Sequence, residues 1–168
     1  MKVAITDANI FIDIINLKFI TQFFELKIDI HTTLDVLDEL HDHQSAILLA
    51  FKSNKKLTVH NLSPEQLDAM QVFIPSKRLS DADKTVIYIA HEEKAMLLSS
   101  DGPARKFAQE KNIETHGLVW LFDELVGNNI INHTMACNKI NELLATNRRY
   151  KEDQRMLEEF EKRLQQWK

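Results

Sequence analysis

The sequence predicts an α/β fold, in which a central parallel sheet of four or five strands has helices on both faces and C-terminal helices follow. Short hydrophobic segments alternate with longer segments of helical periodicity along residues 1–117. This alternation is typical of parallel sheets whose strands are connected by helices. From Gly117 onward only helical periodicity remains, which places the last third of the chain outside the sheet.

The strands are predicted where short runs rich in Val, Ile and Leu are bounded by polar residues. The five predicted strands are Val3–Thr6, Lys27–His31, Leu57–His60, Met96–Ser99 and Ile113–Thr115. Open parallel sheets bind their ligands beyond the carboxyl ends of the strands. Residues that directly follow a strand are therefore the first candidates for function.

The helices are predicted between and after these strands. Their expected ranges are 10–25 (in two pieces), 34–51, 64–72, 81–92, 104–111, 118–126, 134–145 and 149–167. In the last one, Tyr150, Leu157 and Leu164 repeat every seven residues and form a narrow hydrophobic seam. The seam is explained equally well by packing on the same domain, by a homodimer, or by a partner's groove.

Composition narrows the class of protein. The chain of 168 residues is 44% hydrophobic and 27% charged, as in a globular domain. Its single cysteine, Cys137, allows no internal disulfide and favours a reducing compartment. Asp7 and Asp13 interrupt the first hydrophobic run, so we expect no signal peptide, no membrane span and a cytoplasmic protein. The net charge of −4 argues against binding nucleic acid by charge alone.

Two carboxylates are predicted to lie at the same edge of the sheet. Asp7 directly follows the first strand, and Asp101 closely follows the fourth. Taken singly, each has a simpler explanation as the cap of the helix that comes next. Two acids at the same edge of one parallel sheet nevertheless favour a shared site.

A third acid is aligned with the hydrophobic face of a helix. Asp83 precedes Val86 and Ala90 by three and seven residues, which places it in line with the buried stripe. A carboxylate near a buried face is costly unless it is paired or binds a cation. The alternative is a capping box with Ser80.

A fourth acid is not identified by spacing. Asp35, Asp38, Glu39 and Asp42 form an acidic stripe on the helix after the second strand. Such a stripe is most often a solvated face, although one of its members can reach the strand ends. The spacing does not decide which one.

Four motifs in sequence carry a resemblance to a known family. They are Ile5–Asn9 with its Asp-x-Asn, Val36–Leu40, Leu79–Asp83 and Leu97–Asp101. Together they resemble the PIN-domain family, over roughly residues 2–126. The resemblance implies a three-layer PIN-like fold, and the site residues it implies are Asp7, Glu39, Asp83 and Asp101 as catalytic, metal-binding acids with Asn9 and Ser99 in support. Members commonly carry Thr where Ser99 stands, and Ser keeps the hydroxyl.

The resemblance also sets the expected domain organisation. It implies a PIN-like nuclease domain over residues 1–128. Residues 129–168 are then a C-terminal helical extension, packed on this domain or on a partner. The resemblance does not cover the segment from Ile130 to Lys168, and the extension has no role implied by the family.

The implied activity is that of a divalent-metal-dependent nuclease, an endoribonuclease that hydrolyses phosphodiester bonds in RNA. Two carboxylates about 4 Å apart repel by roughly 4 kcal/mol at an effective dielectric near 20, so four of them need Mg²⁺ or Mn²⁺. Arg105 and Lys106 are candidates to contact the nucleic-acid backbone. The family includes the toxins of toxin–antitoxin pairs, so the partners implied are RNA and an antitoxin protein.

Two other classes of protein compete with this hypothesis. A catalytically inactive PIN-like scaffold would bind nucleic acid or protein through the C-terminal helices, although all four acids are present. A phosphatase or phosphotransfer protein of α/β fold is disfavoured, because Asn9 rather than a second Asp stands two residues after Asp7. The chain also lacks a glycine-rich phosphate loop.

Overall fold

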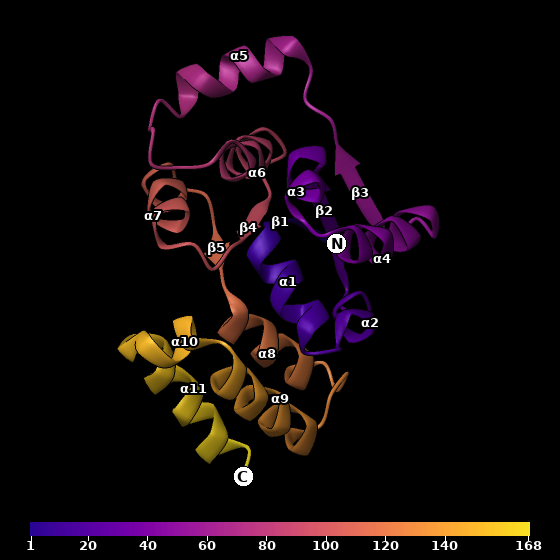
Figure 1. Ribbon diagram of the computed structural model, residues 1–168, viewed down its shortest axis with the longest axis vertical. Coiled ribbons are helices and arrows are strands. Elements are labelled where there is room, and N and C mark those ends of the chain that lie inside the picture. The colour runs from indigo at the N-terminus through magenta and orange to yellow at the C-terminus, as the bar shows by residue number, and fades with distance from the viewer. The chain divides into compact units, whose positions relative to one another are not determined.

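The computed structural model describes residues 1–168, which form two compact units. The first unit contains residues 1–12 and 27–117, and the second contains residues 13–26 and 118–168. Figure 1 shows the strands of the first unit and the helices of both. The units do not follow the division at residue 128, because an early helical segment groups with the C-terminal helices.

The first unit is built on one parallel sheet with strand order β3-β2-β1-β4-β5, which confirms the predicted fold class. The strands are β1 Lys2–Thr6, β2 Ile28–Thr33, β3 Leu57–His60, β4 Met96–Leu98 and β5 Thr115–His116. The central strand, β1, pairs with β2 on one side and β4 on the other. The chain therefore reverses its direction across the sheet between β1 and β4, where open sheets bind ligands.

Helices cover both faces of this sheet, as the sequence predicted (Figure 1). The helices that belong to this unit are α3 Leu34–Glu39, α4 Asp42–Ser53, α5 Pro64–Phe73, α6 Asp81–Glu92 and α7 Gly102–Glu110, together with the first turn of α1 Ala8–Asn16. Right-handed crossovers place α6 and α7 on the face opposite α1 and α4. The α6 helix contacts β1, β2 and β4 directly, and α5 packs on α6 from outside.

The predicted helix over residues 34–51 is wrong in one respect, because the chain forms two helices there. Leu40 has an extended backbone (ψ 153°) and its side chain is buried, so the first helix ends at Glu39. The N–H of His41 donates to Oε1 of Gln44 at 3.0 Å, which starts the next helix. Neither Gly nor Pro marks this break, and hydrophobic periodicity alone did not reveal it.

The second unit is helical. It contains the end of α1 with α2 Ile20–Phe23, α8 Leu118–Gly127, α9 His133–Thr146, α10 Arg148–Glu152 and α11 Gln154–Gln166. Its core is a series of aromatic contacts, in which the ring of Phe122 lies 5.5 Å from Phe19 and 6.1 Å from Phe160. None of the eleven helices of the chain is both long and hydrophobic enough to span a bilayer.

A buried acid connects the early and late segments of this unit. Asp13 is 6% exposed, and its carboxylate accepts hydrogen bonds from the Tyr150 hydroxyl at 2.5 Å and from Nδ2 of Asn147 at 3.1 Å. Burial raises the pKa of Asp13, and these bonds act in the opposite direction. This contact was not predictable from sequence patterns, since the partners are 137 and 134 residues apart.

The C-terminal seam packs in the protein's own helical unit. Of its predicted residues, Tyr150 is buried and Leu157 and Leu164 are half-buried, and the nearby Phe160 and Trp167 are each less than 10% exposed. The predicted single helix over 149–167 is interrupted at Asp153, whose side chain accepts from the Met156 N–H at 3.1 Å and caps α11. Tyr150 therefore belongs to the preceding short helix, and the seam packs within the chain.

Candidate active site

Asp7 lies at the carboxyl end of the central strand and is almost fully buried, at 2% exposure. Its Oδ1 accepts the N–H of Ile10 at 3.0 Å, so the capping explanation is correct for one oxygen. Its Oδ2 accepts the hydroxyl of Ser99 at 2.5 Å. The side chain thus caps α1 and also contacts the neighbouring strand end.

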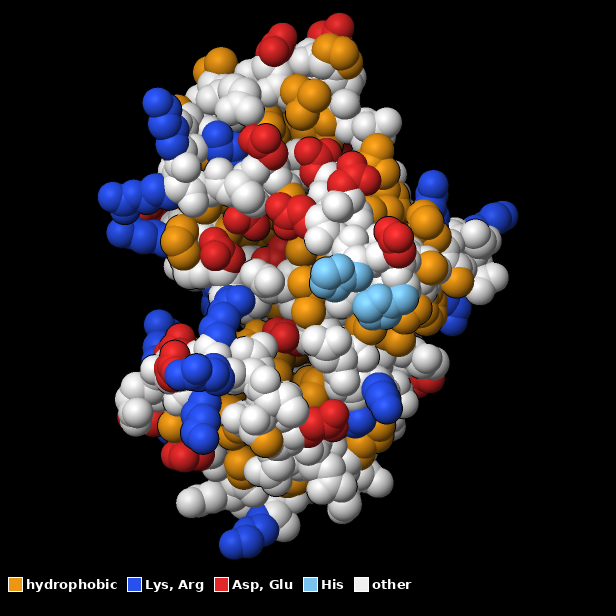
Figure 2. All heavy atoms as spheres, in the orientation of Figure 1, with side chains coloured by type: hydrophobic (Ala, Val, Ile, Leu, Met, Phe, Trp, Pro, Cys, Tyr) orange, Lys and Arg blue, Asp and Glu red, His pale blue; other side chains and the backbone are white.

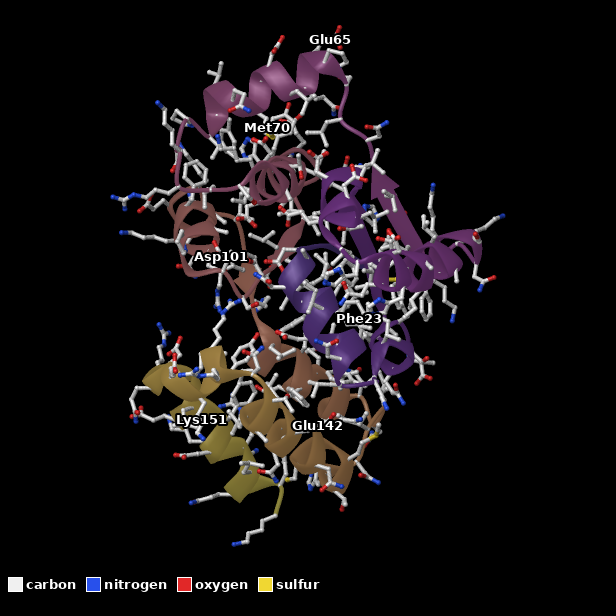
Figure 3. The ribbon with its side chains drawn as sticks, in the orientation of Figure 1. Phe23, Glu65, Met70, Asp101, Glu142 and Lys151 are labelled. Carbon is white, nitrogen blue, oxygen red and sulfur yellow. The ribbon has the colours of Figure 1, made fainter.

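Ser99 connects Asp7 to the acid that follows β4. Its side chain is fully buried, and its Oγ accepts the Asp101 N–H at 3.1 Å. Asp101 in turn caps α7 through Oδ2, which accepts the Ala104 N–H at 2.9 Å. Figure 3 labels Asp101 beside α7. The two acids predicted to share an edge therefore flank the β1–β4 switch point, and one hydroxyl bridges them.

Asp83 is half-buried on the first turn of α6, in line with the fully buried Val86 and Ile87. The Ser80 hydroxyl accepts the Asp83 N–H at 3.1 Å, as the capping alternative predicted. Burial raises the pKa of the Asp83 carboxyl, and the charge of Asp101 raises it further. Hydrogen bonds from Ser80 act against this increase. Ser80 therefore caps α6, and the carboxylate of Asp83 is repelled by the acid at the switch point.

Glu39 is the last residue of α3 and is largely exposed. Partial burial raises the pKa of its carboxyl, followed by repulsion from Asp83 and then from Asp35. For Asp35, the first residue of the stripe, the acids that raise the pKa are Asp38 and Asp81. Of Glu39 and Asp35, Glu39 is therefore the acid that interacts with Asp83, which the spacing alone did not reveal.

The four acids therefore form a connected series, from Asp7 through Ser99 to Asp101, then to Asp83 and Glu39. Figure 2 shows acidic side chains gathered on one face over α3 and α6. No three His, Cys, Asp or Glu side chains are grouped closely enough to enclose one metal ion.

The donor set nevertheless fits a hard divalent cation. All four candidates offer carboxylate oxygens, the ligands that Mg²⁺ and Mn²⁺ prefer. No Lys or Arg contributes to the pKa of Glu39 or Asp83, and repulsion between acids raises both. A bound cation would remove that repulsion.

The basic candidates lie on the helix that Asp101 caps. Arg105 is half-buried, and a Cβ added at Gly117 would meet its Nη1 at 2.8 Å. Glycine at this position, which the sequence analysis did not single out, therefore leaves room for the guanidinium. Lys106 is exposed on α7, and Asn9 is half-buried in the first turn of α1.

Comparison with known families decides the assignment. A family model described as a PIN domain (DUF3368) matches residues 3–166. The chain belongs to the PIN-domain family. The match extends to residue 166, so the expectation that the helical end lies outside the family was wrong. The C-terminal helices of this PIN domain are part of what its family shares.

Three solved structures have a related arrangement of elements. A domain of a functionally unknown protein from Methanocaldococcus jannaschii is 19% identical, with 70% of this chain and 91% of that chain covered and a TM-score of 0.49. A PilT N-terminus domain protein from Sulfolobus solfataricus is 14% identical, with 74% and 93% covered and a TM-score of 0.47. VapBC2 from Rickettsia felis, bound to a promoter DNA fragment, is 16% identical, with 68% and 98% covered and a TM-score of 0.46. Among curated proteins, none matches the chain.

Proposed function

We propose that this PIN-domain protein is a divalent-metal-dependent endoribonuclease. The observation that carries the proposal is the series of carboxylates at the β1–β4 switch point, where Asp7 and Asp101 share the Ser99 hydroxyl. Burial, and then repulsion from neighbouring acids, raises the pKa of the two acids that extend this series, Asp83 and Glu39. The repulsion between these acids costs free energy of folding, and a bound cation would offset that cost.

In this proposal Asp7, Glu39, Asp83 and Asp101 hold Mg²⁺ or Mn²⁺. The cation, when bound, supplies the positive charge that stabilises phosphodiester oxygens and makes water more acidic. Ser99 fixes the orientation of the Asp7 carboxylate and the backbone of Asp101. The exposed Lys106 and the half-buried Arg105 contact the RNA backbone as it enters.

Metal binding is the first test, and it does not depend on a substrate. A ligand that binds only the folded protein raises the melting temperature. We expect Mg²⁺ or Mn²⁺ to raise that of the wild type and to raise those of Asp7→Asn and Asp101→Asn much less. Asp68→Asn, which changes an exposed acid on α5, is the matched control. An equal increase in all four proteins removes Asp7 and Asp101 from the site.

Cleavage of single-stranded RNA is the second test. We expect activity that chelation abolishes and that Asp7→Asn lacks, with products carrying a 5′-phosphate and a free 3′-hydroxyl. A 2′-deoxyribose at the scissile linkage is expected to leave cleavage intact, because the 2′-hydroxyl is not the nucleophile. Cyclic 2′,3′-phosphate ends or activity that survives chelator contradict the proposal. Metal-dependent stabilisation without cleavage indicates the inactive scaffold instead.

We propose that the biological role is that of a toxin held by an antitoxin partner, a role that membership of the PIN-domain family supports. We expect expression of the wild type to arrest growth and expression of Asp7→Asn to leave growth unchanged. Growth that is equal for both proteins contradicts the toxin role while leaving the nuclease activity to the cleavage test.

A further inference from the structure

Two histidines beside the acidic series present parallel rings to solvent. The rings of His41 and His43 have centroids 6.2 Å apart and planes only 8° apart, and both side chains are exposed. The two histidines are two residues apart, a spacing that within a helix points side chains to different sides. Their rings are parallel here because His41 precedes α4 instead of lying within it.

The backbone that carries this pair is held firmly. The N–H of His41 donates to Oε1 of Gln44, a side chain that is only 4% exposed. The hydroxyl of Ser45 donates to the Leu37 carbonyl at 2.9 Å and joins α4 to α3. Leu40, between the two helices, is buried. The two rings are therefore displayed from a fixed turn and not from a mobile loop.

The pair is close to the proposed active site by covalent geometry. His41 follows Glu39 by two residues, and two trans peptide units span at most about 7 Å. Exposed acids stand before the pair, at Asp38, and between its two members, at Asp42. Acidic neighbours repel a phosphate, whereas they leave the stacking of a neutral aromatic base unaffected.

We propose that His41 and His43 form a stacking site for an unpaired base of single-stranded RNA. This inference rests on the proposed function and names the feature of the substrate that is recognised. Aromatic surfaces in contact lie about 3.5 Å apart, so a base between two rings needs roughly 7 Å. The ring centroids are 6.2 Å apart, so the two exposed side chains need to move apart by about 1 Å to admit a base. Proteins that bind single-stranded RNA use histidine and other aromatic side chains in this way.

A thermodynamic cycle tests the proposal. Binding of a short fluorescent RNA is measured in chelator, where no cleavage occurs, for the wild type and for the double variant His41→Ala/His43→Ala. The same measurement uses RNA in which one nucleotide at a time is abasic. A double variant His41→Phe/His43→Phe keeps two aromatic faces without a charge. His133→Ala, which removes an exposed histidine ring 6.1 Å from Trp167 in the helical unit, is the control.

We expect the alanine variant to bind intact RNA about 5- to 150-fold more weakly, the range for loss of one base–aromatic stack. At one abasic position the wild type loses the same factor and the alanine variant loses nothing more. The phenylalanine variant binds as the wild type does. If the alanine variant loses the same affinity for intact and for abasic RNA, the rings contact the RNA backbone and the proposal is overturned. An alanine variant that loses no affinity for intact RNA overturns it as well. Circular dichroism checks that each variant is folded.

Failure of this inference is separable from failure of the proposed function. Metal-dependent cleavage with no base-dependent binding at His41 and His43 leaves the nuclease intact and removes the stacking site. Base-dependent binding without any cleavage keeps the stacking site and refutes the nuclease. A base analogue whose fluorescence is quenched on stacking, placed at the sensitive position, gives a second readout. Quenching by the wild type but not by the alanine variant supports the site, and equal quenching by both contradicts it.

Discussion

Replacing Ser99 by alanine tests whether one hydroxyl holds the acidic series together. The change removes a short hydrogen bond to the buried Asp7 carboxylate, at 2.5 Å, and the acceptor of the Asp101 N–H. A hydrogen bond to a charged group contributes about 1.5–3 kcal/mol, and an orphaned N–H costs about 1 kcal/mol. We therefore expect Ser99→Ala to lower the free energy of unfolding by about 3 kcal/mol.

The control is Ser45→Ala, which removes a neutral hydrogen bond to the Leu37 carbonyl. Loss of such a bond costs about 0.5–1.5 kcal/mol. Both variants are unfolded with urea in chelator and followed by far-UV circular dichroism. Tryptophan fluorescence is a poor probe here, because Trp120 and Trp167 both belong to the helical unit.

The reasoning predicts a clear order of stability. Ser99→Ala is expected to lose at least twice as much free energy of unfolding as Ser45→Ala. For a chain of this length, about 3 kcal/mol corresponds to a decrease of roughly 6–12 °C in melting temperature. Equal losses in the two variants would show that the Ser99 bond to Asp7 has no special strength. The bridging hydroxyl would then be incidental to the arrangement of the acids.

Three further predictions concern ionisable groups. The pKa of Asp83 is higher in the folded protein than in the unfolded chain. Without metal, Asp83 therefore costs no free energy of unfolding below its unfolded-state pKa, and the protein becomes less stable as pH rises through its folded-state pKa. Asp83→Asn is therefore expected to be more stable than wild type at pH 7 in chelator and equal to it at about pH 3, by urea titration. Burial lowers the pKa of His60 in the folded protein. The stability that depends on neutral His60 is therefore present above about pH 6.5 and is lost as pH falls through the folded-state pKa. His60→Asn is expected to flatten the melting-temperature curve between pH 7 and pH 5, and an unchanged slope contradicts this. Tyr150→Phe is expected to cost about 1.5–3 kcal/mol by leaving the Asp13 carboxylate short of a donor, read by tryptophan fluorescence. No loss would mean that Asp13 is protonated and needs no donor.

The sheet and its functional edge were predictable, because they depend on local patterns. Each strand is a short hydrophobic run, and a parallel sheet places the residues after β1 and β4 at one edge whatever the details. Asp7 and Asp101 were therefore placed at this edge from position alone. Asp83 was selected because it is in line with Val86 and Ala90 on its helix.

The remaining features depend on contacts between distant residues. Choosing Glu39 from its stripe required the resemblance, since its charge interaction with Asp83 crosses two helices. No glycine or proline marks the break between α3 and α4 at Leu40. The contact of Asp13 with Tyr150 joins residues 137 positions apart. Periodicity describes one element at a time, so it contains no information on these pairings.

The interleaving of the two units has a consequence for how the protein is made. Residues 13–26 leave the ribosome before any strand after β1, yet their partners in the helical unit follow the last strand of the sheet, β5. Until then Phe19 has no Phe122 to contact, and Asp13 has no Tyr150. A nascent chain can assemble its parallel sheet while the hydrophobic side chains of residues 13–26 are still exposed to solvent. Translation of the helices after β5, rather than completion of the sheet, is therefore the step that allows side chains such as Phe19 to become buried.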